Sequence, residues 1–278
     1  MKTIEYVDAT AFLADARRFL EEKETLNSLI LGLAIQLEES GNQALFFSVK
    51  QNEEILIVAM QTPPLKLLLS DGDPSALPCF LAYINASTRS LQVPGLTGPR
   101  QITKAFAKLW PEKHTIVMRQ LVYRLEKVKL PEHPATGYLR PAQESDLDLL
   151  VKWRIAFTRE AMGETVAEEE IRSTLIQRIP TQSLFIWDDQ GPVSMAAVAR
   201  PTRNGVSVNF VYTPTVHRKK GYASITVAEM SQKMLKQGYQ FCTLFTDADF
   251  PSSNKIYQSM GYFEVGHFLS IAFEKSKD

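Results

Sequence analysis

The stretch VYTPTVHRKKGYASITVAEMSQKMLKQG, residues 211–238, joins an apolar strand to a predicted helix through a short basic turn. Gly221 lets the backbone turn tightly, and Ala223 keeps the first helical turn clear. Several backbone N–H groups then converge at the helix start, where the helix dipole adds roughly half a positive charge. The stretch therefore predicts a phosphate or pyrophosphate site, although a solvated basic turn between a strand and a helix is the alternative interpretation.

The helix behind the turn is predicted to span residues 222–237. Its apolar residues fall on one face, with a glycine as C-terminal cap: Ala223, Val227, Met230, Met234 and the cap Gly238. The turn does not have the spacing of a P-loop or of a Gly-x-Gly-x-x-Gly dinucleotide fingerprint. A kinase, a P-loop NTPase or a Rossmann dehydrogenase is therefore not indicated.

Outward from this stretch, the second half of the chain alternates strand and helix patterns. We expect helices at 144–161, 165–178 and 252–260, and strands at 138–142, 183–187, 193–200, 205–213 and 240–246, with a final strand pair within 262–274. Helices and strands mixed in this order predict an α/β fold with a mixed sheet flanked by helices.

The first half shows similar patterns. We expect helices at 9–22, 26–39, 74–87 and 101–110, and strands at 44–50, 54–60, 65–70 and 116–128, with VPGLTGPR (93–100) as a turn. Both halves place a glycine-containing turn directly before a late helix, GLTGPRQITKAF and HRKKGYASITVAEM, which indicates a tandem repeat. The Pro-rich stretch KLPEHPATG (129–137) separates the predicted domains, 1–130 and 138–278.

Composition limits the classes of function. The chain has 278 residues, 45% of them hydrophobic, which suits two globular cores. Lys plus Arg and Asp plus Glu both number 31, so no overall field attracts nucleic acid or an anionic membrane. No signal peptide or membrane span is recognisable, and we expect a cytoplasmic protein.

Cysteine and histidine residues give no sign of a metal or of covalent catalysis. Cys79 and Cys242 lie in apolar surroundings far apart in sequence, as buried reduced thiols do. The four histidines have no metal-ligand spacing, so we predict no metal: His114, His133, His217 and His267.

Two motifs carry a resemblance to a known family. VYTPTVHRKKGYA resembles the acetyl-CoA loop of the GNAT N-acetyltransferase superfamily, Arg/Gln-x-x-Gly-x-Gly/Ala after a strand with Val-x-x-Pro. Arg218, Gly221 and Ala223 fill its defining positions. SNKIYQSMGY (253–262) resembles the superfamily's second signature, with one helix and one strand between the two. The resemblance covers residues 138–274, and the first half resembles the degenerate amino-terminal domain of tandem GNAT proteins.

The resemblance implies acetyl-CoA as cofactor and coenzyme A as product. The loop from Arg218 to Ser224 would hold the pyrophosphate, and the exposed end of the strand before it would pair with the pantetheine amides. A strand N–H near Val211 could also polarise the thioester carbonyl. The implied cofactor-binding residues are Val211, Tyr212, Thr213, Arg218, Lys219, Lys220, Gly221, Tyr222, Ala223, Ser224 and Asn254, among which Tyr222 is also a candidate packing residue.

Tyr257 is the predicted catalytic residue. When an amine attacks a thioester a thiolate leaves, and a phenol can protonate it as general acid. The alternative is that the Tyr257 ring packs and only hydrogen-bonds the cofactor sulfur. The general base is not identified: Glu160 and Asp247 are candidates by position alone. Strand alternation predicts that Asn209 faces the substrate, but an asparagine cannot act as a base.

The sequence thus predicts an N-acetyltransferase that acetylates a primary amine, of a small molecule or a peptide, by direct attack in a ternary complex. Two alternatives stay open: a non-catalytic acyl-CoA sensor, in which the missing base is real, and a protein whose basic loop binds nucleic acid. The equal numbers of positive and negative residues argue against nucleic acid as a partner. Nothing in the sequence indicates that the protein binds a membrane. The sequence does not indicate the oligomeric state, and a homodimer is one option.

Overall fold

The computed structural model describes residues 1–86, 92–163 and 165–274, and it divides into two compact units. Neither unit is continuous in sequence. Unit 1 comprises residues 1–123, 245–251 and the segment from 264 onward, and unit 2 comprises residues 124–244 and 252–263. The domains predicted from the sequence, 1–130 and 138–278, are the two copies of a repeat along the chain, which differ from these compact units. Their boundaries stay a prediction.

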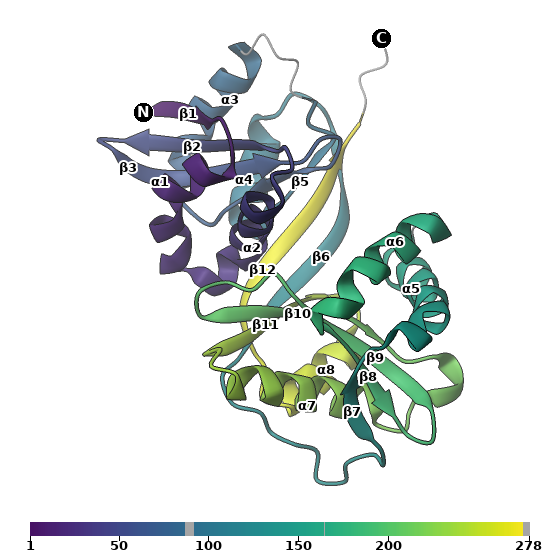
Figure 1. Cartoon of the computed structure of the whole chain (residues 1–278). Coiled ribbons are helices and arrows are strands. Elements are labelled where there is room, and N and C mark those ends of the chain that lie inside the picture. The colour runs from purple at the N-terminus through teal and green to yellow at the C-terminus, as the bar shows by residue number, and fades with distance from the viewer. Residues whose placement is uncertain (87–91, 164, 275–278) are drawn as a thin grey trace. The chain divides into compact units, whose positions relative to one another are not determined.

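One order of helices and strands occurs twice within the described residues (Figure 1). The first series is β1 (Lys2–Tyr6), α1 (Ala9–Glu22), α2 (Glu24–Ser40), β2 (Leu45–Gln51), β3 (Glu54–Gln61), β4 (Leu67–Leu69), α3 (Leu77–Ala86), β5 (Gly95–Pro99), α4 (Arg100–Leu109) and β6 (His114–Leu125). The second series is β7 (Tyr138–Pro141), α5 (Leu147–Met162), α6 (Glu168–Arg178), β8 (Leu184–Asp188), β9 (Pro192–Ala199), β10 (Gly205–Tyr212), α7 (Tyr222–Lys236), β11 (Phe241–Asp247), α8 (Pro251–Ser259) and β12 (Phe263–Phe273). This repetition confirms the predicted tandem arrangement.

Both units contain a mixed sheet. The strand order is β1-β2-β3-β4-β5-β12-β6 in unit 1 and β11-β10-β9-β8-β7 in unit 2. Pairs with a described register are antiparallel, apart from β4 with β5 and β10 with β11, which are parallel. The parallel pair stands at the same place in each series, so the two repeats share one topology.

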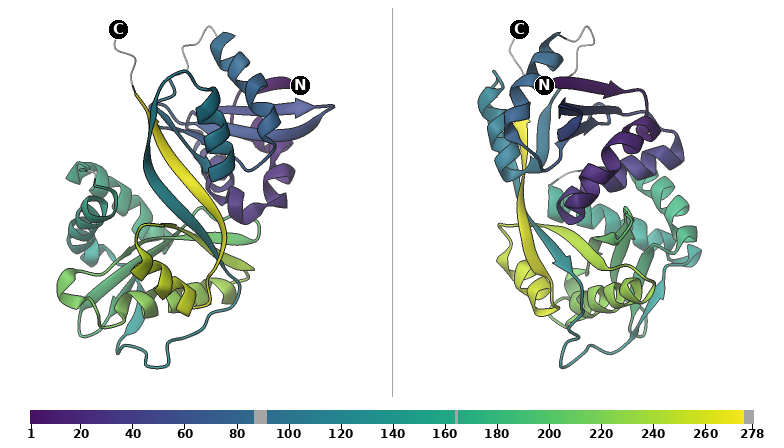
Figure 2. Two further views of the ribbon diagram at one scale, coloured as in Figure 1. Left: turned by 180° about the vertical axis from the view of Figure 1, so that it is seen from behind. Right: turned by 90° about the vertical axis from the view of Figure 1, so that its left-hand side faces the viewer.

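Helices cover both faces of each sheet because successive strand residues point to opposite sides (Figure 2). In β2, Phe46 packs with α1 and α2, whereas Phe47 packs with α3 and α4. In β8, Ile186 packs with α5 and α6, whereas Trp187 packs with α7. None of the helices in the described part of the chain combines the length and apolar composition needed to cross a lipid bilayer.

Two expectations about elements were wrong. VPGLTGPR contains strand β5 rather than a turn, because Gly95 lies so close to β12 that a Cβ there would meet the Ile271 carbonyl oxygen at 2.1 Å. The C-terminal strand pair is the single strand β12, which pairs with β5 from Phe268 to Ala272. Strand β1 was not expected. Of the helix expected at 74–87, residues 77–86 form α3, and residue 87 lies outside the described residues.

The internal match between the halves also pairs different elements from those expected. GLTGPRQITKAF forms β5 and α4, and by element order its counterpart is β11 with α8. The counterpart of α7 is α3, which follows the acidic loop SDGDPSA, residues 70–76. There the Asp73 carboxylate accepts a hydrogen bond from the Ser75 N–H at 2.8 Å, so an acidic side chain already caps this helix start. The helix start in the first repeat is therefore capped by a carboxylate, whereas the start of the helix at Tyr222–Lys236 has no side-chain cap.

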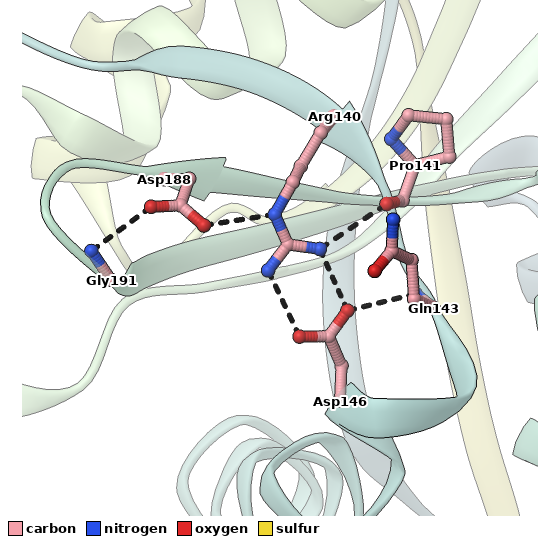
Figure 3. A network of polar contacts seen from close by, with 6 residues as sticks. All are labelled: Arg140, Pro141, Gln143, Asp146, Asp188 and Gly191. Atoms are coloured by element: carbon pink, nitrogen blue, oxygen red, sulfur yellow. Dashed lines mark hydrogen bonds and ion pairs between the residues drawn. The ribbon is translucent and has the colours of Figure 1, made fainter.

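A network around Arg140 fixes the start of α5 in unit 2 (Figure 3). Its guanidinium donates two hydrogen bonds to Asp146, at 2.7 and 2.9 Å, and one to Asp188 on β8, at 2.9 Å. The Gln143 N–H donates to Asp146 and the Gly191 N–H donates to Asp188, so both carboxylates have further partners. Burial raises the pKa of Asp146, but the bonds from Arg140 and Gln143 outweigh it and leave that pKa below its ordinary value.

Replacing Arg140 by glutamine is expected to destabilise the protein by about 3 kcal/mol, because two largely buried carboxylates lose their counter-ion. Urea unfolding at pH 7 measures the loss, with Arg172→Gln, which removes a more exposed ion pair on α6, as the control. The pKa of Asp146 is lower in the folded protein than in the unfolded chain. Asp146 therefore contributes to the free energy of unfolding above the unfolded pKa of about 3.9, and this contribution disappears as the pH falls through the pKa of the folded state. An Arg140→Gln variant as stable as wild type at pH 7 would contradict this account.

Candidate functional site

The predicted cofactor-binding residues and Tyr257 all lie in unit 2, which contains β10 and the start of β11. Within this unit the parallel pairing of β10 with β11 covers Gly205, Val206 and Ser207 and goes no further. The rest of β10, to Tyr212, leaves its backbone N–H and C=O groups on that side without a strand partner from unit 2. An extended, amide-containing ligand could occupy such an open edge as an added strand.

A β-bulge lies in the same half of β10. Asn209 is paired with Ala197 and Tyr212 with Met195, so Phe210 and Val211 together face the single residue between them on β9. Phe210 has a φ of +52°, in the left-handed region that non-glycine residues rarely adopt. Bulges leave backbone groups unpaired and are frequent beside active sites, and the two residues within this bulge are Phe210 and Val211.

The turn before α7 has the geometry of an anion site. Lys219 has a φ of +63° and Gly221 a φ of +81°, and this alternation turns successive N–H groups toward one point. Gly221 is the N-cap residue and no side chain caps the helix, so the first-turn N–H groups of Tyr222, Ala223 and Ser224 have no intrahelical acceptor. Gly221, Lys219 and Lys220 are exposed. The predicted phosphate loop therefore has an uncapped helix start and free positive charge.

Arg218 lies at the beginning of this loop but is engaged within the protein. Its Nε donates to the Thr213 carbonyl at 2.8 Å, and its guanidinium pairs with Glu160 on α5. The loop is thereby tied to the end of β10. A contact between Arg218 and a cofactor stays a prediction, and Lys219 and Lys220 are the exposed cations of the loop.

Tyr212, Thr213 and Tyr222 use their side chains for packing and internal hydrogen bonds. The Tyr212 ring packs against Trp153, and the Thr213 hydroxyl pairs with Ser194 at 2.9 Å. The Tyr222 ring is buried beside Trp187, and its hydroxyl donates to Asp189. Any contact of these residues with a ligand would therefore be made by their backbone.

Helix α8 carries the second predicted motif. Asn254 is buried, and the half-buried Tyr257 packs its ring edge-to-face on Tyr262, with 5.9 Å between centroids. Burial raises the pKa of Tyr257 to about 12, so its phenol stays protonated throughout the physiological range. The Tyr262 hydroxyl instead pairs with Ser231. The Tyr257 phenol is therefore protonated at neutral pH, as a general acid has to be.

The two candidate bases are held in other interactions. Glu160 accepts hydrogen bonds from Arg218 and from the Tyr212 hydroxyl, and the hydrogen bond from Arg218 lowers the pKa of Glu160. Asp247, which belongs to unit 1, accepts a hydrogen bond from the Asp249 N–H at 2.8 Å and closes its own turn. A depressed pKa makes Glu160 a poor proton acceptor.

Glu160→Gln is therefore expected to leave kcat within about fivefold of wild type. Removal of a general base would instead lower kcat about 100-fold or more. The measurement is kcat and kcat/KM over pH 6–9. Glu144→Gln, at the start of the helical segment that leads into α5, is the matched control. A 100-fold loss of kcat together with loss of its acidic pH limb would identify Glu160 as the base.

The cysteines and histidines do not form a metal site within the part of the chain that the structure describes. Cys242 is buried, and burial raises the pKa of its thiol to about 12, so it is not a reactive nucleophile. Both cysteines are free thiols, with Cys79 half-buried. Across the described residues, no three His, Cys, Asp or Glu side chains are arranged to hold a metal ion. His217 lies edge-to-face with the Tyr222 ring, at 6.4 Å.

Sequence reasoning missed three arginines on the α5 and α6 side of β10: Arg154, Arg178 and Arg200. The guanidinium of Arg154 lies 3.7 Å from the centroid of the Phe210 ring. Arg154 stands three residues from the buried Val151 and three from Phe157 along α5, so helical spacing places it on the buried face. That spacing was the available signal.

Comparison with known protein families found a match in the second repeat. A family model described as FR47-like protein matches residues 189–269, which include the phosphate loop and α8. No curated protein matches the sequence.

Solved structures resemble the whole chain. An acetyltransferase of the GNAT family from Colwellia psychrerythraea has a TM-score of 0.63 at 14% identity, covering 99% of this chain and 100% of the other. A GCN5-related N-acetyltransferase from Sphaerobacter thermophilus has a TM-score of 0.62 at 13% identity, covering 97% and 94%. A tandem GNAT protein from the clavulanic acid biosynthesis pathway, described as without AcCoA, has a TM-score of 0.60 at 9% identity. That match covers 100% of this chain and 100% of the other. The chain therefore has the fold of the GNAT superfamily, in a tandem, two-domain arrangement.

Proposed function

We propose that the second repeat is an N-acetyltransferase, which transfers the acetyl group of acetyl-CoA to a primary amine by direct attack in a ternary complex. The observation that carries this proposal is the juxtaposition, in unit 2, of an unpaired strand end and an uncapped helix start. Pairing of β10 with β11 stops at Ser207, and α7 begins at Gly221 without a side-chain cap. Pantetheine amides and a pyrophosphate require such a pair of features.

The residues of this loop and strand fit the parts of acetyl-CoA. The first-turn N–H groups of α7 would bind the pyrophosphate, with Lys219 and Lys220 adding charge. The free backbone at the bulge, around Val211, would hold the pantetheine arm and point an N–H at the thioester oxygen. Asn254, buried on α8, would fix the arm from the other motif. Acetyl-CoA would supply an activated acetyl thioester.

Tyr257 would act as the general acid. In the transfer, a bond forms between the amine nitrogen and the acetyl carbon, the carbon–sulfur bond breaks, and the sulfur takes a proton. Because the Tyr257 phenol is protonated at neutral pH, it can donate that proton. The proton that the amine loses would pass to water, since Glu160 is engaged with Arg218.

The alternative is a module that binds acyl-CoA without catalysis, and the engagement of Glu160 is the observation in its favour. Amine-dependent release of free thiol from acetyl-CoA distinguishes the two functions. Thiol release that rises with the concentration of an acceptor amine supports the enzyme. Tight binding of acetyl-CoA, with no release for any amine in a broad panel, supports the sensor.

A further inference from the structure

Three arginines of unit 2 lie close to one another, and two of them face the same aromatic ring. Arg154 comes from α5, Arg178 ends α6, and Arg200 follows β9. The guanidinium carbons of Arg154 and Arg178 lie 3.7 and 5.1 Å from the centroid of the Phe210 ring, which is the bulged residue of β10. Arg154 and Arg178 thus face the same ring beside the open strand end, and Arg200 lies near enough to Arg178 for their charges to interact.

These positive charges have no carboxylate partner among the described residues. Ion pairs do neutralise other arginines of unit 2, such as Arg140, Arg172 and Arg218. Burial, with the nearby charges of Arg200 and Arg154, lowers the pKa of Arg178 to about 10. Cations held this close without a counter-ion repel one another, which costs folding free energy.

Unsatisfied polar atoms lie on the same side of the sheet. Buried atoms without a hydrogen-bond partner include Arg154 Nη1, Arg200 Nε, Ser207 Oγ and Asn209 Oδ1. Asn209 is directly opposite Ala197 on β9, and Ala197 packs in the core beneath α5 and α6. Ser207, two residues earlier, shares that face. Buried polar atoms in folded proteins nearly always have a hydrogen-bond partner, so four such atoms in one region indicate a place for a polar ligand.

We propose that Arg154, Arg178 and Arg200 bind an anionic group, a carboxylate or a phosphate, that the acceptor amine carries. This inference rests on the proposed function and names the class of acceptor. A guanidinium matches the planar carboxylate or the phosphate with paired hydrogen bonds, and Asn209 and Ser207 can complete the contacts. The pyrophosphate of the cofactor is not the anion concerned, because its proposed site is at α7, on the other face of the sheet.

The partly buried arginines favour a small acceptor. All three side chains are half-buried, and two of them lie against the Phe210 ring, so a compact charged group fits better than an extended polyanion. Anchoring this group on the α5 and α6 side would leave the amine next to the free backbone at Val211. The acceptor is thus expected to be an amino acid or an aminoalkyl phosphate.

Matched pairs of amines test the inference without turnover. Calorimetric titration of the full chain, in the absence of acetyl-CoA, compares each free amino acid with its carboxamide, and phosphoethanolamine with ethanolamine. At least one anionic member should bind about tenfold or more tightly than its neutral partner, as hydrogen bonds to charged groups provide. Preference in the amino acid pairs identifies a carboxylate, and preference in the phosphoethanolamine pair identifies a phosphate.

Arg154→Gln should remove most of this preference, whereas Arg172→Gln, the matched surface control on α6, should retain it. Arg200→Gln serves as a second variant if Arg154→Gln does not fold. Equal binding of charged and neutral members, no binding of any anionic member up to millimolar concentration, or a preference that survives both variants would each overturn the inference.

Turnover distinguishes this failure from failure of the proposed function. Thiol release at equal rates for the charged and neutral members of every pair would keep the acetyltransferase and reject the anionic acceptor. Anion-selective binding that depends on Arg154, with no thiol release from any pair, would keep the anion site and contradict the proposed function.

Discussion

Tyr257→Phe should lower kcat about 100-fold or more, because the variant loses the only proposed donor of a proton to the leaving sulfur. The affinity for acetyl-CoA should change by less than about threefold, since the phenyl ring still packs on Tyr262. The difference between kcat and affinity separates a general acid from a packing residue. Steady-state thiol release and calorimetry on one preparation measure both quantities.

The pH profile of wild type adds a second test of Tyr257. Its pKa is raised from the ordinary value of 10 to about 12, so the acid form persists at pH values below that. Up to pH 10 the solution stays roughly two units or more below this pKa. No decline of kcat from ionisation of Tyr257 is therefore expected between pH 7 and 10.

A matched control is Tyr239→Phe, in the connection between α7 and β11, which should leave kcat unchanged. The general-acid assignment is contradicted if Tyr257→Phe retains full kcat with a substrate that wild type turns over. Tyr257 would then be a packing residue on α8, and water would have to supply the proton.

Gly221→Glu should weaken binding of acetyl-CoA about 100-fold or more, equivalent to about 2.7 kcal/mol. The substitution places a side chain at a φ of +81°, where non-glycine residues are strained. It also puts a carboxylate at the helix start that is proposed to receive the pyrophosphate. Isothermal titration with acetyl-CoA measures the loss.

Gly238→Glu offers a matched control, because Gly238 also has a positive φ, +106°, with open space around it, after the opposite end of the same helix. This variant pays a similar backbone cost but should bind acetyl-CoA as wild type does. Equal affinity of Gly221→Glu and wild type would place the cofactor elsewhere.

The basic turn and the helix after it were predictable because their determinants are local, whereas phosphate binding by this turn stays a prediction. Gly221, the basic residues before it and the apolar face of α7 are all readable within one stretch, and Val227, Met230 and Met234 are indeed buried. The tandem repeat was also predictable, although from the wrong pair of elements. The true counterpart of α7, helix α3, follows a loop whose Asp73 caps the helix start, and this acidic loop is readable in the sequence.

Other features depend on contacts between distant segments. The register that ends pairing of β10 with β11 at Ser207, and the bulge at Phe210, arise from three strands together. Glycine in VPGLTGPR suggested a turn, but close approach of β5 to β12 requires it in a strand. The arginines around Phe210 come from α5, α6 and the end of β9, so their proximity has no local signature.

The most direct test of the central claim is a calorimetric titration of the full wild-type chain with acetyl-CoA, repeated with acetyl-pantetheine, which lacks the pyrophosphate. We expect one acetyl-CoA to bind per chain with micromolar affinity. Acetyl-pantetheine should bind much more weakly, because the α7 N–H groups, Lys219 and Lys220 then have no pyrophosphate to bind. No binding of acetyl-CoA, or equal affinity for both compounds, would contradict the assignment of this loop to the cofactor.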